Sequence, residues 1–178
     1  QFIPAKKHIE DAKTLLQAIK DQGWDDINWA AYIRADNIDA ELAQLMVDTG
    51  MSYFEIGITS GSQELVRKMS LAYDLERVLN NCRMLVKSGF KNHVSVNYSF
   101  NVFDETPSTI RQTIAYHREL ENIFGKGLVD PAIFFIGLQP HTLLEKYALE
   151  HKILKPNYNP MSMMPWTARK LLWNPGSL

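Results

Sequence analysis

The stretch Phe54-Glu-Ile-Gly-Ile-Thr-Ser-Gly-Ser-Gln63 predicts a strand that runs directly into a helix. Its three apolar residues alternate with small or polar ones, which is typical of a β-strand. The alternation stops at Thr59-Ser-Gly-Ser62, where small residues would let a ligand approach the backbone. Ser60 and Gln63 have the spacing of a helix capping box. In a parallel α/β protein such a strand end lies at the edge where ligands bind, although a single turn of this kind can also be purely structural.

The same strand, polar turn and helix recur along the chain. The apolar patterns predict strands over 27–33, 54–58, 93–103 and 132–138, each followed by helical periodicity, and a further helix begins at Pro4. The last strand is apolar on both sides, as expected for a strand covered by helices. This order predicts an α/β fold, a partial TIM-like barrel of about four parallel βα units, because four strands are too few to close a barrel.

Composition excludes several classes of protein. The net charge of −1 provides no basic footprint for nucleic acid or an anionic membrane surface, and no apolar run is long enough to span a bilayer. The only cysteine, Cys82, leaves no internal disulfide and fits a reducing compartment, which predicts a cytoplasmic protein. Because the chain begins at Gln1 in what resembles the middle of a fold, we expect a fragment. Four prolines after Lys155 predict a domain over 1–154 and an irregular C-terminal extension over 155–178.

Polar residues follow each of the four expected strands. They are Arg34 and Asp36, then Thr59, Ser60 and Ser62, then Asn101, Asp104 and Glu105, and finally Gln139, His141 and Thr142. Because parallel strands end at the same edge of a sheet, we expect these residues along one rim. Loops are polar in many proteins, so a purely structural rim is the alternative.

Five segments between Trp29 and Leu154 carry a more specific pattern. They are Arg34-Ala-Asp-Asn-Ile-Asp39, Leu45-Met-Val-Asp-Thr-Gly50, Ile56-Gly-Ile-Thr-Ser-Gly-Ser-Gln63, Asp104-Glu-Thr106 and Gln139-Pro-His-Thr142. In order and spacing they resemble the radical S-adenosylmethionine (radical SAM) superfamily, especially members that often carry a cobalamin-binding domain. The resemblance implies a partial barrel that binds SAM and a [4Fe-4S] cluster at the strand-end rim. One electron from the cluster would cleave SAM to a 5′-deoxyadenosyl radical, which takes hydrogen from a substrate.

The resemblance also implies a set of cofactor-binding residues: Arg34, Thr59, Ser60, Asn101, Glu105 and Gln139. Thr59 and Ser60 fall where the family contacts the ribose or the methionyl part of SAM. Residues 101–106 match a Gly-x-Pro-Gly-Glu-Thr loop near the adenine, and residues 139–142 match a Pro-x-Gly-Thr-type loop. No catalytic residue is assigned, and we predict no metal ligand in this chain.

The chain departs from the family pattern where the cofactor would bind. Thr59 stands where the family usually has Glu, Leu71 where a Lys is common, and three glycines of the matched loops are replaced. The family motif Cys-x-x-x-Cys-x-x-Cys precedes the matched region, and clusters need thiolate ligands. We therefore expect this polypeptide alone to hold no cluster and to be inactive. SAM and the [4Fe-4S] cluster would belong to a parent protein, with cobalamin in a separate domain. The partner of this chain would be the missing N-terminal part of the barrel. The substrate would be a small molecule that the sequence does not identify.

Two other classes stay open. One is a different βα-barrel enzyme that depends on a metal, with His93, His117, His141 and His151 as candidate ligands beside Asp104 and Glu105. No His-x-x-x-His pair supports it. The other is a scaffold domain that kept the fold and lost the chemistry, which the missing glycines and charges favour.

Overall fold

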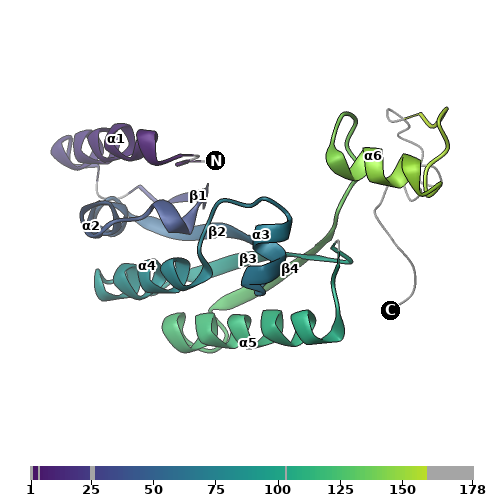
Figure 1. Ribbon diagram of the computed structural model, residues 1–178. Coiled ribbons are helices and arrows are strands. Elements are labelled where there is room, and N and C mark those ends of the chain that lie inside the picture. Colours follow the sequence, from purple (N-terminus) through teal and green to yellow (C-terminus); the bar gives the residue numbers. More distant parts are fainter. Residues whose placement is uncertain (1, 4, 25–26, 103, 160–178) are drawn as a thin grey trace.

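The computed structural model describes residues 2–3, 5–24, 27–102 and 104–159, in which helices and strands alternate (Figure 1). The elements are η1 (Lys6–His8), α1 (Ile9–Asp21), β1 (Trp29–Ile33), η2 (Ala35–Asn37), α2 (Ala40–Asp48), β2 (Met51–Thr59), α3 (Gln63–Lys68), α4 (Leu75–Lys87), β3 (His93–Phe100), α5 (Pro107–Phe124), β4 (Val129–Phe135) and α6 (Leu143–Glu150). The strands form one parallel sheet in the order β1-β2-β3-β4. The predicted α/β fold with four parallel βα units is confirmed.

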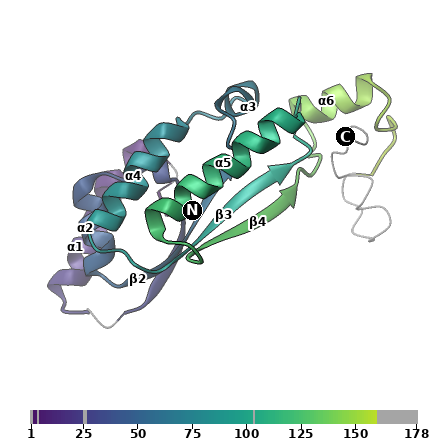
Figure 2. The same cartoon turned by 90° about the horizontal axis from the view of Figure 1, so that it is seen from below.

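The sheet has one packed face and one open face. Phe54, Ile56 and Ile58 of β2 are buried toward the helices, and Phe54 stacks edge-on with Phe90 and Phe124 at centroid distances of 5.3 and 5.8 Å. Figure 2 shows α2, α4 and α5 on this side, and no described helix lies along the other. Because successive strand residues point to opposite faces, Glu55 and Gly57 lie on the open face.

Local sequence signals explain where most helices begin. The Asp39 carboxylate accepts the Leu42 N–H at the start of α2, as its position before the apolar pattern predicts. Thr106 caps α5 in a reciprocal capping box with Thr109, and Pro107 occupies the first turn. These contacts are short-range, so the helix starts could be predicted without knowing the tertiary structure.

The fourth strand differs from the prediction. It covers Val129–Phe135 rather than 132–138, and Ile133, Phe134 and Phe135 are more than half exposed. The expectation of a strand covered on both sides is therefore wrong. The reason is that α6 stands away from the sheet (Figures 1 and 2) and packs instead in a small second cluster with Leu138 and Leu154.

The proposed division at residue 154 stays a prediction. Tyr158 packs against the second cluster, so the described chain continues past that boundary without a break in packing. The short helix expected near 166–173 lies outside the described residues.

An ion pair between α1 and α2 predicts part of the acid sensitivity of the fold. Lys20 Nζ lies 2.6 Å from Asp48 and lowers the pKa of that carboxyl, and Gln44 adds a hydrogen bond at 2.7 Å. A lowered folded-state pKa gives stability that is present above the unfolded pKa and is lost as the pH falls through the folded value. Between about pH 6 and pH 3 the unchanged protein should therefore lose more unfolding free energy than Asp48→Asn. We expect a difference of about 0.5 kcal/mol, because the pair is near the surface.

Urea titrations of both proteins at each pH measure this difference. In a Lys20→Met background the same substitution should have a smaller effect, since the ion pair is already gone. An unchanged pH dependence in Asp48→Asn would contradict the assignment.

Candidate functional site

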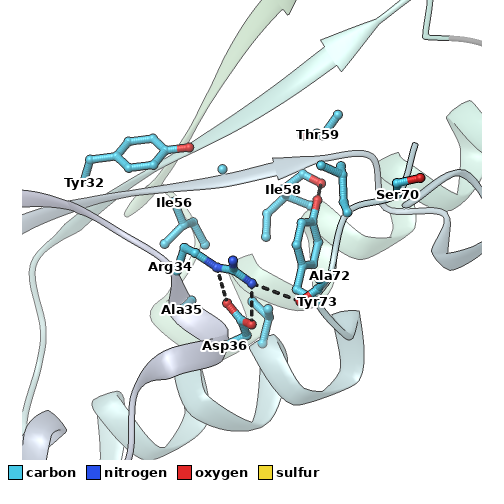
Figure 3. Close-up of a pocket in the computed structure, with 13 residues that line it drawn as sticks. Tyr32, Arg34, Ala35, Asp36, Ile56, Ile58, Thr59, Ser70, Ala72 and Tyr73 are labelled. Atoms are coloured by element: carbon cyan, nitrogen blue, oxygen red, sulfur yellow. Dashed lines mark hydrogen bonds and ion pairs between the residues drawn. The ribbon is translucent and has the colours of Figure 1, made fainter. Parts of the chain in front are cut away.

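A pocket of about 380 Å³ lies where β1 and β2 end. Its polar lining is Tyr32, Arg34, Asp36, Thr59, Ser70 and Tyr73, and its apolar lining includes Ile56, Ile58 and Leu71. In Figure 3, Arg34, Asp36 and Tyr73 lie on the side of β2 that Ile56 and Ile58 face, whereas Tyr32 and Thr59 lie on the other side. The pocket therefore wraps around a strand end, and its volume falls in the range of small-molecule sites.

Arg34 connects the end of β1 to the loop between α3 and α4. Its Nε and Nη2 donate to the two oxygens of Asp36 at 3.1 and 2.9 Å, and Nη2 also donates to the Ala72 carbonyl at 3.0 Å. Asp36 is only 7% exposed, so the guanidinium neutralises a buried carboxylate. Arg34 Nη1 bonds no group of the described residues, so its two N–H groups are available to a ligand.

Tyr73 closes the pocket and was not predicted as a site residue. Its hydroxyl donates to the Ile58 carbonyl, and burial raises its pKa to about 12, so it is protonated at neutral pH. Gln63 holds its loop: the side-chain amide donates to the Tyr73 carbonyl at 3.2 Å, and its oxygen accepts the Leu75 N–H at 2.8 Å. The predicted Ser60–Gln63 capping box is wrong, because α3 begins after Ser62 and Gln63 is turned toward this loop.

Thr59 has an unusual backbone. Its φ of 58° is left-handed, and the register between β2 and β3 shifts between Gly57 and Thr59. A β-branched residue is strained in this region, and such strain persists only where the surrounding structure requires it. The strained turn places Thr59 at the pocket and sends the following residues toward α5.

Ser60 and Gly61 contact α5 rather than the pocket. Ser60 is 1% exposed, its Oγ accepts the Ser62 N–H at 3.1 Å and lies 3.4 Å from Thr113 Oγ1. The Gly61 N–H donates to the same threonine oxygen at 2.9 Å. We expected a ligand to approach the backbone at these small residues, but helix α5 packs against them instead.

The remaining predicted residues lie farther along the same sheet edge. The Asn101 N–H donates to Glu105 Oε2 at 2.7 Å, across a turn in which Asn101 has a φ of 57°. Burial raises the pKa of Glu105, and this N–H opposes the shift. Gln139 is exposed after β4, and its carbonyl accepts from Thr142 Oγ1 at 2.7 Å. Of the six predicted residues, only Arg34 and Thr59 line one pocket; the cofactor roles of all six stay predictions.

Comparison with known proteins agrees with this fold. Residues 5–117 match the model of the radical SAM superfamily, which is more than half of the chain. The chain therefore belongs to the radical SAM superfamily. No curated protein matches it.

Among solved structures, the chain is similar to two of the radical S-adenosylmethionine methyltransferase TsrM from Kitasatospora setae. One contains the tryptophan substrate and the SAM analogue aza-SAM (19% identity, TM-score 0.61, covering 82% of this chain and 27% of that chain). The other contains cobalamin and a [4Fe-4S] cluster (20% identity, TM-score 0.61, covering 83% and 28%). At this identity the likeness shows the fold, and the chain spans little more than a quarter of TsrM.

The residues present do not fit an iron–sulfur cluster. Cluster iron needs several thiolates, and the chain has one cysteine. Cys82 is buried on α4, and burial raises its pKa to about 12, so it is a neutral thiol in the core.

The structure also describes the groups that the metal-dependent alternative would use. His93 Nδ1 lies 3.3 Å from Asp130, and His117 Nδ1 lies 3.2 Å from the Tyr98 hydroxyl. Within residues 2–159, apart from the undescribed positions, no three His, Cys, Asp or Glu side chains are grouped to hold a metal ion. Nor does any helix of these ranges have the length and apolarity to cross a membrane.

Proposed function

We propose that this chain forms the SAM-binding part of a radical SAM active centre. The observation that carries the proposal is the pocket at the ends of β1 and β2, inside the segment that matches the superfamily. Parallel α/β folds bind ligands at this edge, so fold and pocket agree.

The pocket offers groups suited to a zwitterionic nucleoside cofactor. The free Nη1 of Arg34 would donate to the methionyl carboxylate or to a ribose oxygen, and the Thr59 hydroxyl would contact the same part of SAM. Ile56, Ile58 and Leu71 would contact the apolar surface of the ligand. Tyr73 and Gln63 position this lining without needing to react. The cofactor, when bound beside a cluster, supplies radical chemistry.

The thiolates for the cluster would come from outside these 178 residues, because Cys82 cannot supply them. In this proposal the chain alone does not cleave SAM, and the missing part of the barrel is its partner. Cobalamin, present in one of the similar TsrM structures, would occupy a separate domain. A cytoplasmic location is part of the same proposal. The substrate and the class of reaction are not assigned.

Calorimetric titration of SAM into the 178-residue chain tests the proposal. We expect saturable binding of one SAM with a Kd on the order of 0.1 mM, about −5.5 kcal/mol, since the cluster contacts are absent. Thr59→Val keeps the branched side chain and removes one hydroxyl, so the affinity should fall about fivefold. Thr14→Val, the same substitution at an exposed position on α1 and outside this pocket, is the matched control and should bind like the unchanged chain.

The scaffold alternative gives the opposite result. It is favoured by Ser60 and Glu105, whose side chains already bond within the fold. If no saturable heat is seen in any of the three proteins, the site has lost SAM binding and the scaffold interpretation holds.

A further inference from the structure

Three side chains from adjacent strands meet on the open face of the sheet. They are Tyr32 on β1, Glu55 on β2 and Asn97 on β3, and we call them the open-face triad. Tyr32 pairs in register with Glu55, and Asn97 pairs with Gly57, one step farther along the face. The three residues are therefore neighbours across adjacent strands on one face of the sheet.

The triad is bonded internally but retains an unused acceptor. The Asn97 amide nitrogen donates to Glu55 Oε1. The Asn97 carbonyl oxygen Oδ1 is buried and bonds no described group. A buried polar atom without a partner costs free energy, so its presence calls for an explanation. Protein groups do not supply the missing donor, although a ligand could.

Gly57 is required by this arrangement. A Cβ built on Gly57 would lie 2.0 Å from the Tyr32 hydroxyl oxygen, so a side chain at this position would displace the tyrosine. Burial and the nearby Glu55 charge raise the pKa of Tyr32, whereas the Asn97 amide lowers it. The glycine thus lets the phenol lie beside the carboxylate and the amide.

Three oxygen acceptors lie in or beside the triad. Glu55 has a second carboxylate oxygen, Asn97 has its unpaired Oδ1, and Asp130 lies on the same face in register with Ser95. The nearest guanidinium, that of Arg34, bonds Asp36 on the other side of β2 and so does not neutralise Glu55. The face therefore favours a group that donates hydrogen bonds and carries positive charge.

We propose that the open-face triad binds a primary ammonium group of the substrate, next to the SAM pocket. Tyr32 and Gly57 line that pocket as well, so the two sites adjoin at this point. This inference rests on the proposed function and adds a substrate class to it. The ammonium would donate to the second Glu55 oxygen, and to the buried Asn97 Oδ1 after a side-chain movement that opens this atom, and the Tyr32 ring would cover its alkyl stem.

The triad can be tested with the 178-residue chain and a small probe. The side-chain NH₂ signals of Asn97 are followed by ¹⁵N-resolved NMR during titration with n-butylammonium chloride, n-butanol and sodium butyrate, at constant ionic strength. We expect the cation to bind at least about fivefold more tightly than the alcohol and butyrate not to bind, as a partly buried ion pair requires.

Two substitutions assign the effect to the triad. Glu55→Gln removes the charge while keeping an oxygen for the Asn97 amide, and it should abolish the preference for the cation over the alcohol. Asn97→Leu removes Oδ1 and should weaken cation binding; because it has no side-chain NH₂ group, its titration is followed by the backbone amide signals of Glu55 and Gly57. Ser99→Ala, on the same strand and the same face but outside the triad, is the matched control and should change nothing. Thermal unfolding shows whether each variant is folded.

The outcomes separate this inference from the proposed function. If SAM fails to bind but the cation preference is present, only the SAM pocket is refuted. If Glu55→Gln weakens SAM as much as it weakens n-butylammonium, the triad belongs to the cofactor site and the inference is overturned. It is also overturned if no probe gives a saturable shift up to about 100 mM, which corresponds to a binding free energy of about −1.4 kcal/mol. Equal binding of the alcohol and the cation would overturn it as well.

Discussion

Gly61→Ala is expected to lower the free energy of unfolding by about 3 kcal/mol, an overpacking effect at the upper end of the usual range. A Cβ at Gly61 would lie 2.5 Å from Thr113 Cα, 2.7 Å from Tyr116 Cβ and 3.0 Å from the Gln112 carbonyl oxygen. Two of these atoms belong to the backbone of α5, so the helix or the β2–α3 loop must move. Urea denaturation followed by circular dichroism measures the loss.

Gly137→Ala is the matched control for this substitution. A Cβ at Gly137 would have no heavy atom within 4 Å, so the same change in composition should leave stability within about 0.5 kcal/mol. The comparison also separates two explanations of the glycine in this turn. If Gly61 were required only for approach of a ligand, Gly61→Ala would weaken SAM binding and leave stability unchanged.

The second large effect is expected at Arg34. Arg34→Lys should weaken SAM binding at least about tenfold, because hydrogen bonds to charged groups contribute about 1.5–3 kcal/mol. A lysine can still neutralise Asp36, but a single ammonium cannot hold both carboxylate oxygens, contact the Ala72 carbonyl and present further N–H groups to a ligand. Calorimetry measures the affinity, and thermal unfolding measures the effect on the fold.

Two comparison variants sharpen this test. Arg118→Lys lies on α5, away from the pocket, and should bind SAM like the unchanged chain. Glu105→Gln keeps an oxygen to accept the Asn101 N–H, so we expect its affinity to be unchanged as well, although the sequence placed Glu105 among the cofactor residues. If Arg34→Lys binds SAM normally while Glu105→Gln does not, the cofactor lies over the turn after β3 rather than in the pocket at β1 and β2.

Much of the fold could be predicted from local patterns. The alternation around Phe54 placed β2, and Asp39 and Thr106 marked the starts of α2 and α5. Parallel pairing followed from the βα order, since sequential parallel strands need helical crossovers. The family, too, was indicated by short segments at strand ends and is confirmed by the match over residues 5–117.

The composition of the site could be predicted only in part. Arg34 and Thr59 share a pocket because Arg34 directly follows β1 and Thr59 is the last residue of β2, and strand ends converge in a parallel sheet. Tyr73 was not predicted because it lies between two helices in a loop without a recognisable pattern, and long-range bonds to Gln63 and to the Ile58 carbonyl bring it to the pocket. Exposure of β4 was missed for a related reason: its apolar residues predict burial, yet α6 packs elsewhere.

The order of elements, the parallel sheet and the polar strand ends are encoded in short stretches of this chain, because hydrophobic periodicity and helix caps act over a few residues. Which of those polar residues face a pocket was decided by contacts between distant segments, such as Gly61 with Thr113 and Arg34 with Ala72. Such contacts depend on where whole helices pack, and their free energy is gained only after the sheet has assembled. The direction in which a serine or a glutamate finally points is therefore a property of the tertiary structure.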